Sequence, residues 1–269
     1  MLTTVGDLDR RLRQRELDEK LLGMGRKYLI MSGKGGVGKT TIAASLALAK
    51  AREGKRTGIL DIDFHGPNLP GALYMEGRVR AGDDGKLIPT EYHPNLFVLS
   101  LQQLLGNPDE AVLWRGPRKM RAILQFLSDT AWPGLDYFFI DSPPGTGDEA
   151  LTVARNVPGL QAILVTTGHS LSLSDAAKAV GFLRSTGVGI FGVVDSLGFM
   201  VCPNCGEDLV IHRKEGVEAF AARENIPLLA RLPLDVDAQK RSENMGKPML
   251  EAAPASRFSQ EIIKLAEKL

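Results

Sequence analysis

The sequence predicts an α/β fold with a doubly wound, mostly parallel sheet that is flanked by helices on both faces. Short apolar runs alternate with helical patterns from Lys27 onward, and the runs at residues 137–140 and 162–165 are apolar on both faces. A strand that is apolar on both faces belongs in a parallel sheet with helices on each side. Ligands of such a sheet bind at the carboxyl ends of its strands.

The same patterns place the expected elements along the chain. Strands are expected at residues 28–32, 57–61, 96–100, 136–141, 161–166, 190–195 and 228–231. Helices are expected at residues 39–53, 110–129, 148–156, 172–186, 214–224, 235–245 and 255–268. Residues 75–95, which are rich in glycine and charge, are expected to form a surface excursion.

The N-terminal segment differs from the rest of the chain. Residues 1–25 are dense in balanced charge, with a narrow apolar stripe of Leu8, Leu12, Leu21 and Leu22. This pattern predicts a charged helix that packs on the domain, or a partly disordered segment. Residues 26–269 are expected to form one domain.

Composition excludes several classes of protein. The net charge of +1 over 269 residues argues against a nucleic-acid partner bound by bulk electrostatics. The chain holds only two cysteines, which rules out a disulfide framework. It has neither a signal-peptide pattern nor an apolar run long enough to span a bilayer. We therefore expect a cytoplasmic protein with no membrane partner.

The first motif is a phosphate-binding loop between an expected strand and an expected helix. It reads Gly33-Lys34-Gly35-Gly36-Val37-Gly38-Lys39-Thr40-Thr41 and fits G-x-x-x-x-G-K-[ST]. Its glycines let backbone N–H groups surround a polyphosphate, and the helix N-terminus adds partial positive charge. Lys39 should reach the β- and γ-phosphates, and the Thr40 hydroxyl should bind Mg²⁺.

Carboxylates follow two other expected strands. Asp61 and Asp63 come at the end of the second strand, and Asp141 ends the strand at 136–141. Their position favours a role in a Mg²⁺ and water network beside the phosphate loop. The segment at 142–148 follows, and the backbone N–H groups of Gly145 and Gly147 are candidates to contact a γ-phosphate in a loop that moves when the phosphate leaves.

The second distinctive motif is Cys202-Pro203-Asn204-Cys205-Gly206. A Cys-x-x-Cys turn directs two thiolates at one ion, but structural Zn²⁺ and a cubane iron–sulfur cluster each require four ligands. The missing ligands would come from a second copy of the chain, or from His212 and a carboxylate. A redox-active pair and an inert pair remain alternatives.

Together these motifs resemble the Mrp/ApbC family, the Nbp-type iron–sulfur cluster carrier ATPases of the MinD-like deviant phosphate-loop class. The resemblance covers the chain from about Lys27 to the C-terminus. The residues that carry it are the phosphate loop with Ser32, the stretches at 61–70, 114–117 and 136–148, and the cysteine loop at 202–206.

The resemblance implies a role for each matching residue. Lys34 is similar to the signature lysine that reaches the partner subunit's nucleotide in an ATP-sandwich dimer. Asp63 is similar to the residue that orients the attacking water, and Asp61 and Asp141 to Mg²⁺-associated acids. Cys202 and Cys205 are expected to pair with the same residues of a second subunit around one [4Fe–4S] cluster, which would pass to apo-proteins with the help of assembly factors.

The sequence departs from the family pattern near the nucleotide base. Ser196 stands where the family often has an asparagine that contacts adenine, and Gly168 and His169 replace a Pro-Gln pair. ATP remains the expected nucleotide because no guanine-recognition motif occurs. Two other functions stay open: a MinD/ParA-like positioning ATPase, and an ATPase dimer with a structural zinc site between its subunits.

Overall fold

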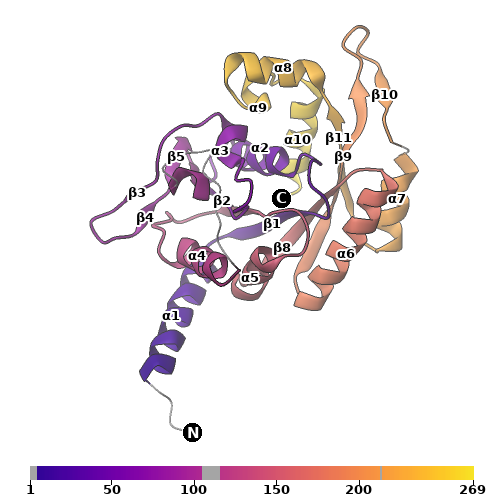
Figure 1. Ribbon diagram of the computed structural model, residues 1–269. Helices are drawn as coiled ribbons and strands as arrows, with labels where there is room; N and C mark the ends of the chain where they lie inside the picture. Colours follow the sequence, from indigo (N-terminus) through magenta and orange to yellow (C-terminus); the bar gives the residue numbers. More distant parts are fainter. Residues whose placement is uncertain (1–4, 105–115, 213) are drawn as a thin grey trace.

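The computed structural model describes residues 5–104, 116–212 and 214–269, and its centre is one large sheet (Figure 1). The sheet has nine strands in the order β10-β9-β8-β1-β7-β2-β6-β5, with β11 paired to β9. All neighbours pair in parallel except β5 and β10, which are antiparallel. The predicted doubly wound, mostly parallel sheet is confirmed.

Seven strands of this sheet lie where the apolar runs predict them. They are β1 (Arg26–Ser32), β2 (Thr57–Asp61), β6 (Leu96–Ser100), β7 (Tyr137–Asp141), β8 (Leu160–Thr166), β9 (Gly189–Val201) and β11 (Leu228–Leu234). β9 continues six residues beyond its predicted end at 195, because β11 and β10 pair with its second half. Strands β3 (Arg80–Ala81), β4 (Leu87–Ile88), β5 (Thr90–His93) and β10 (Asp208–Val210) were not expected, and β5 draws part of the predicted surface excursion into the sheet edge.

The predicted helices are also found. They are α2 (Lys39–Arg52), α4 (Gly116–Ser128), α5 (Asp148–Asn156), α6 (Ser170–Thr186), α7 (Lys214–Arg223), α8 (Val236–Met245) and α10 (Arg257–Glu267). Residues 110–115 of the helix expected at 110–129 lie outside the described residues. Short helices α3 (Leu69–Leu73) and α9 (Met249–Ala252) and the 3-10 turn η1 (Leu101–Leu104) were not predicted.

Two hydrophobic layers cover the two faces of the sheet. In β1, Leu29 and Met31 face the layer that contains α4, α5, α6 and α7, whereas Tyr28 and Ile30 face the layer that contains α2 and α10. These β1 side chains are all at most 1% exposed. The strand therefore buries both faces, which explains why its sequence is apolar without alternation.

The N-terminal helix α1 (Val5–Leu22) extends from the body of the molecule beside α4 (Figure 1). Leu17 and Leu21 are buried in the layer under α4, but Leu22 is 66% exposed and does not belong to the apolar stripe. Lys20 Nζ donates hydrogen bonds of 2.6 Å to the carbonyl oxygens of Ser128 and Thr130. The last turns of α1 are thus attached to the domain.

The C-terminal helix α10 packs on the domain in the same way. Phe258, Ile262 and Leu265 are buried against the layer that contains α2. Ser256 caps the helix by accepting a hydrogen bond from the amide of Ser259. The apolar face that a membrane-targeting helix would need is therefore occupied by the protein core.

Two glycines of the phosphate loop, Gly33 and Gly35, should respond differently to substitution. A Cβ at Gly33 would lie 2.4 Å from the backbone carbon of Asp175 in α6, whereas a Cβ at Gly35 would meet its nearest neighbour, Pro144 Cγ, at 3.8 Å. Because a helix backbone cannot yield as a side chain can, Gly33→Ala should lower the free energy of unfolding by about 2–3 kcal/mol. Gly35→Ala is the matched control and should change it by less than about 1 kcal/mol.

Urea unfolding of both variants without nucleotide measures this difference. Equal stability of the two variants would show that Gly33 is not required by the packing of α6.

Candidate functional site

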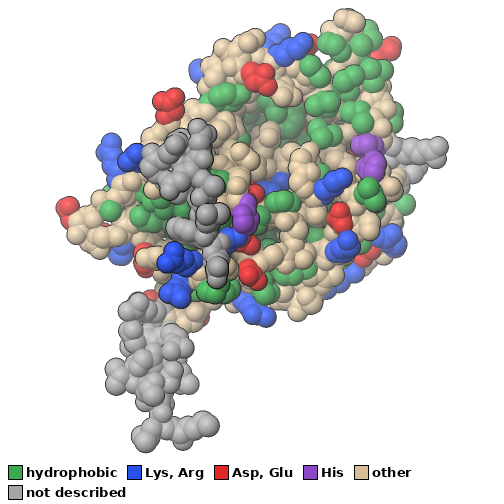
Figure 2. Space-filling model, in the orientation of Figure 1, with side chains coloured by type: hydrophobic (Ala, Val, Ile, Leu, Met, Phe, Trp, Pro, Cys, Tyr) green, Lys and Arg blue, Asp and Glu red, His purple; other side chains and the backbone are tan. Residues whose placement is uncertain are grey.

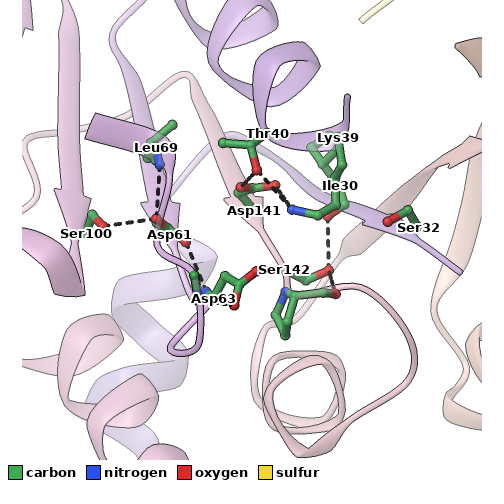
Figure 3. Close-up of polar contacts among 12 residues, drawn as sticks. Ile30, Ser32, Lys39, Thr40, Asp61, Asp63, Leu69, Ser100, Asp141 and Ser142 are labelled. Carbon is green, nitrogen blue, oxygen red and sulfur yellow. Dashed lines mark hydrogen bonds and ion pairs between the residues drawn. The ribbon is translucent and has the colours of Figure 1, made fainter. Parts of the chain in front are cut away.

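The register of three parallel strands gathers the predicted site residues at one edge of the sheet (Figure 3). β7 lies between β1 and β2, and Asp141 at its end pairs with Ile30 of β1 and Asp61 of β2. The phosphate loop begins after Ser32, which ends β1 two residues beyond Ile30. Carboxylates and loop are close because parallel strands end at the same side.

Asp141 is the point at which the phosphate-loop side chains converge. Lys39 Nζ lies 2.5 Å from Asp141 Oδ1, and Thr40 Oγ1 donates a 2.7 Å hydrogen bond to Asp141 Oδ2. The side chains of Lys39 and Asp141 are 7% and 1% exposed. Figure 3 shows the side chains of Lys39 and Thr40 at the start of α2 pointing toward Asp141 at the end of β7. The adjacent residues Lys39 and Thr40 thus form one polar cluster with a carboxylate that lies 102 and 101 residues away in sequence.

The loop itself has the backbone that phosphate binding requires. Gly36 and Gly38 adopt positive φ values of 77° and 79°, a region that side chains disfavour. Val37 is buried and anchors the loop, while Thr41 is half-buried at the start of α2. Lys34 is exposed and forms no ion pair with any residue in the described ranges. Its ammonium group is therefore available to a partner outside this chain.

Asp61 and Asp63 order the loop that follows β2. Asp61 Oδ1 accepts from the amide of Asp63 at 2.9 Å, and Asp61 Oδ2 accepts from Ser100 Oγ at 3.0 Å. Asp63 Oδ1 accepts from the amides of His65 and Gly66 at 3.2 and 3.1 Å. Both carboxylates therefore have structural partners, and the water-orienting role of Asp63 and the Mg²⁺-associated role of Asp61 stay predictions.

Burial dominates the acid–base behaviour of these carboxyls. Burial, together with the smaller effect of the Asp141 charge, raises the pKa of Asp61 to about 7, although the Asp63 amide and Lys39 act to lower it. Burial also raises the pKa of Asp141, while the nearby Lys39 ammonium lowers it. A cation bound at this edge would relieve the repulsion between the two groups.

The loop after β7 is tied to the strand that precedes the phosphate loop. Ser142 Oγ donates to the carbonyl of Ile30 at 3.1 Å, and the amide of Gly145 donates to the carbonyl of Ser32 at 2.7 Å. Gly145 has φ +90°. The amide predicted to contact a γ-phosphate is therefore engaged with Ser32 in this structure, so such a contact requires the loop to move.

A buried ion pair lies beside this loop and was not predicted from the sequence. Lys119 of α4 lies 2.8 Å from Glu149 Oε1 of α5 and 2.5 Å from His65 Nε2 in the loop after β2. Lys119 and Glu149 are 7% and 6% exposed. A Cβ at Gly116, at the start of α4, would lie 2.8 Å from Asp148 Oδ2. The Gly116-Pro117 pair, whose partners Trp114 and Arg115 lie outside the described residues, thus brings α4 close to α5.

A pocket of about 400 Å³ adjoins the phosphate loop on the side of α8. Gly36, Thr41, Ser196 and Asp235 are among the residues that line it, together with Tyr74. Of these lining residues, the loop residues and Ser196 were predicted from the sequence to lie near the nucleotide. The others come from α2, α3, β9, β11, α8, α9, α10 and the turns between them, and no local pattern marks most of them as neighbours of a phosphate loop.

The Cys-x-x-Cys turn forms the tip of a hairpin made by β9 and β10. The amide of Cys202 donates to the carbonyl of Glu207, and the amide of Gly206, at φ +76°, donates to the carbonyl of Cys202; both bonds are 2.9 Å. Hydrogen bonds from the backbone amides of Cys205 and Asn204 lower the pKa of the Cys202 thiol. A lowered thiol pKa favours the thiolate, the form that binds metals.

The hairpin is an exposed apolar surface. Leu209, Val210 and Ile211 are 44%, 68% and 41% exposed, and Cys205 is exposed at the tip. Figure 2 shows hydrophobic side chains gathered at the upper right, where Figure 1 places β9 and β10. Consecutive exposed apolar residues beside two free thiols are typical of a surface that another protein covers.

His212 is too far away to complete the cysteine site. Its amide bonds to the carbonyl of Gly198, four residues before Cys202 along β9, which corresponds to roughly 13 Å. The structure therefore gives no support to the alternative in which His212 joins the cysteines on one ion within a protomer. In the part of the chain that the structure describes, no group of three or more His, Cys, Asp or Glu side chains could hold a metal ion.

Comparisons with known proteins show the family to which this chain is similar. Residues 23–269 match the family described as NUBPL iron-transfer P-loop NTPase. A cytosolic Fe-S cluster assembly factor, the NUBP2 homolog of Trichoplax adhaerens, is 42% identical over 88% of this chain and 92% of its own length. An iron-sulfur cluster carrier protein of Methanocaldococcus jannaschii is 36% identical over 94% of this chain and 88% of its own length.

Solved structures of nucleotide-binding proteins and ATPases share the fold of this chain. A nucleotide-binding protein from Archaeoglobus fulgidus, in complex with ADP, is 33% identical and superposes with a TM-score of 0.77 over 92% of this chain and 96% of its own. The cell division ATPase MinD of Pyrococcus furiosus is 26% identical, with a TM-score of 0.65 over 91% of this chain and 98% of its own. Across the described ranges, no helix is both long and apolar enough to cross a bilayer.

The buried carboxyl of Asp61 predicts an unusual dependence of stability on pH. Because its folded pKa of about 7 lies above the unfolded value, the folded state holds a proton that the unfolded state has lost between about pH 4 and 7. The free energy of unfolding should therefore fall as the pH rises through this window. Between pH 5.5 and 7.5, Asp61→Asn should reduce this fall by about 1–2 kcal/mol.

Urea unfolding at the two pH values, without nucleotide or divalent cations, tests this expectation. The exposed Asp237→Asn variant is the control and should follow the parent. Identical pH slopes for the parent and Asp61→Asn would contradict it.

Proposed function

This chain belongs to the family of NUBPL iron-transfer P-loop NTPases, and we propose that it is an ATP-hydrolysing carrier of iron–sulfur clusters. In this proposal two copies hold one [4Fe–4S] cluster between them and pass it to apo-proteins. The observation that carries it is the combination, in one protomer, of a phosphate-binding loop and an exposed hairpin with only two cysteine ligands. Relatives named as iron–sulfur cluster assembly factors and carriers support the same cargo.

The proposed nucleotide is ATP. Its phosphates would bind at residues 33–41, and its base would enter the adjoining pocket beside Ser196 and Tyr74. The ADP named in the related structure supports an adenine nucleotide at this place. Ser196, at the position where the family often has asparagine, would contact the base with a hydroxyl instead of an amide.

The residues at the sheet edge fit Mg²⁺. A hydroxyl at Thr40 and carboxylates at Asp141 and Asp61 are the oxygen donors that this cation takes, and their mutual repulsion favours a cation. We propose that Thr40 holds the ion and that Asp141 and Asp61 contribute directly or through water. When bound, Mg²⁺ neutralises charge on the phosphates during transfer.

Hydrolysis then requires this chain to position charge and water. Lys39 would leave Asp141 to contact the β- and γ-phosphates, and Asp63 would orient the attacking water. The exposed Lys34 would reach across to the nucleotide of the second copy. Movement of the loop at Gly145, released from Ser32, would change the angle between copies and so the hold on the cluster.

In this proposal Cys202 and Cys205 bind the cluster, which is the cargo of the protein. Two thiolates per protomer make half of a cubane site, and a second copy supplies the other half through a two-fold axis. The apolar residues 209–211 beside the turn would be covered in such a dimer. Apo-proteins that accept the cluster and factors that load it are the proposed partners, and the names of the relatives support a place in the cytosol.

Anaerobic reconstitution with iron and sulfide tests the cargo. The parent should gain the broad visible absorption of sulfur-to-iron charge transfer and about four irons per dimer, and Cys202→Ala should lose both. Cys202→Ala should keep its nucleotide affinity, because the cysteine is remote from the phosphate loop, and this serves as its folding control.

Iron uptake that does not depend on Cys202 would contradict the carrier function. Tight zinc without iron or sulfide, in protein prepared without oxygen, would favour the structural zinc dimer instead.

A mixing experiment tests whether Lys34 acts in the partner's site. Lys34→Ala and Lys39→Ala should each abolish ATP hydrolysis by a homodimer. A mixed dimer has one site with Lys39 from one copy and Lys34 from the other, so an equal mixture should regain about a quarter of the parental rate.

Hydrolysis rates of the two variants alone and mixed, at saturating ATP, measure this effect. If Lys34 acts within its own copy, every site in the mixture lacks one lysine and the mixture stays inactive. That outcome would contradict the trans role.

A further inference from the structure

Arg231 of β11 joins the nucleotide pocket to the base of the cysteine hairpin. Its Nε lies 3.0 Å from Asp195 Oδ2. Its Nη2 donates to the carbonyl oxygens of Gly198 and His212 at 3.0 and 3.1 Å. Asp195 and Gly198 belong to β9, and His212 follows β10. One guanidinium group therefore contacts both arms of the chain at the base of the hairpin.

The segment of β9 between two of these contacts is a bulge. Arg231 pairs with Asp195 and Pro233 pairs with Phe199, so four residue steps of β9 correspond to two steps of β11. The extra residues include Ser196 and Leu197, which line the pocket beside the phosphate loop. Leu197 has φ +55°, an uncommon backbone conformation for a leucine. Such a bulge persists only when its two ends are held.

Arg231 holds both ends. The ion pair with Asp195 fixes the residue before Ser196, and the bond to Gly198 fixes the residue after Leu197. Asp195 is 2% exposed, and its other carboxylate oxygen has no hydrogen-bond partner among the described residues. The carboxylate therefore depends on Arg231 for its position.

Gly198 leaves the space that this ion pair occupies. A Cβ there would lie 2.6 Å from Arg231 Nε and 2.7 Å from Asp195 Oδ2. The pair therefore packs directly against the Cα of Gly198. The side chain of Arg231 is 21% exposed, so the ion pair is largely shielded from water and from screening by salt.

The far end of the hairpin has few other supports. Residues 203–211 are exposed, and β10 pairs only with residues 199–201 of β9 in the described sheet. The amides of Ile211 and His212 both bond to the carbonyl of Gly198, the same carbonyl that accepts from Arg231. A shift of the bulge thus moves the point from which both hairpin strands extend.

We propose that Arg231 is a positioning residue that couples the nucleotide pocket to the cysteine pair. A nucleotide in contact with Ser196 and Leu197 changes the bulge, Arg231 transmits the change to Gly198 and His212, and the hairpin alters the direction of its two thiolates. This inference rests on the proposed function, because it requires a nucleotide in the pocket and a metal at the cysteines. By linkage, occupancy of either site changes the affinity of the other by the same factor.

The test measures metal affinity with and without nucleotide. Zn²⁺ serves as the probe, titrated at fixed protein concentration against a chromophoric chelator in excess Mg²⁺, with ADP absent or saturating. In the parent, ADP should change the Zn²⁺ affinity at least about fivefold. In Arg231→Met, which keeps the side-chain length and removes the guanidinium group, the change should be under about twofold, while each ligand alone binds within about threefold of the parent.

Three variants make the test specific. Arg231→Lys keeps the charge but not the forked geometry, and should retain an intermediate coupling. Asp195→Asn keeps the shape of the side chain and weakens the bond to Arg231, and should also reduce the coupling if Arg231→Met fails to fold. Arg257→Met is the matched control, because Arg257 contacts Asp208 of the hairpin at 3.6 Å but does not touch the bulge. It should couple as the parent does.

The outcomes separate this inference from the proposed function. The role of Arg231 would be overturned if both Arg231→Met and Asp195→Asn coupled the two sites as the parent does. It would also be overturned if ADP did not change the Zn²⁺ affinity of the parent. Either result would leave the proposed carrier function intact. Zn²⁺ binding that is unchanged in Cys202→Ala, or no ADP binding by the parent, would overturn the proposed function and this inference with it.

Discussion

The parallel pairing of β1 with β7 is the constraint on which the rest of the site depends. It sets Ile30 beside Asp141, so the chain leaving β1 must form its phosphate loop around the carboxylate that ends β7. Lys39 and Thr40 then meet Asp141 at 2.5 and 2.7 Å. The close approach of α6 to Gly33 holds the other side of the loop. Loop conformation, charge pairing and helix packing therefore depend on one strand register.

Electrostatic strain is concentrated at the same edge. Asp61 and Asp141 are buried side by side, and the buried ammonium group of Lys39 lies beside them. An arrangement of this kind stabilises the empty protein poorly, and gains most when a cation and a polyphosphate enter together. The Lys119–Glu149 pair with His65 connects the two loops that would respond, because it joins α4 and α5 to the segment after Asp63.

The cysteine hairpin differs from this buried site because it is exposed. Its tip is exposed, its thiol is activated by backbone amides, and its sides are apolar. It is connected to the pocket beside the phosphate loop through strand β9, which bulges at Ser196 and Leu197 before it reaches Cys202. In the proposed carrier, the cluster site would therefore share the root of its hairpin with the nucleotide site.

The sequence by itself determined the fold class, the seven main strands, most helices and the two motifs, because apolar periodicity and glycine spacing are local properties. It also predicted that the cysteines form half a site, since the chain has no others. Only the tertiary structure decided what lies across from each motif. The extension of β9, the contacts of Lys119 and Arg231, and the pocket wall from α3 and α8 arise from register and packing between distant segments. No local pattern encodes such contacts, because each is the joint result of several elements folding against one another.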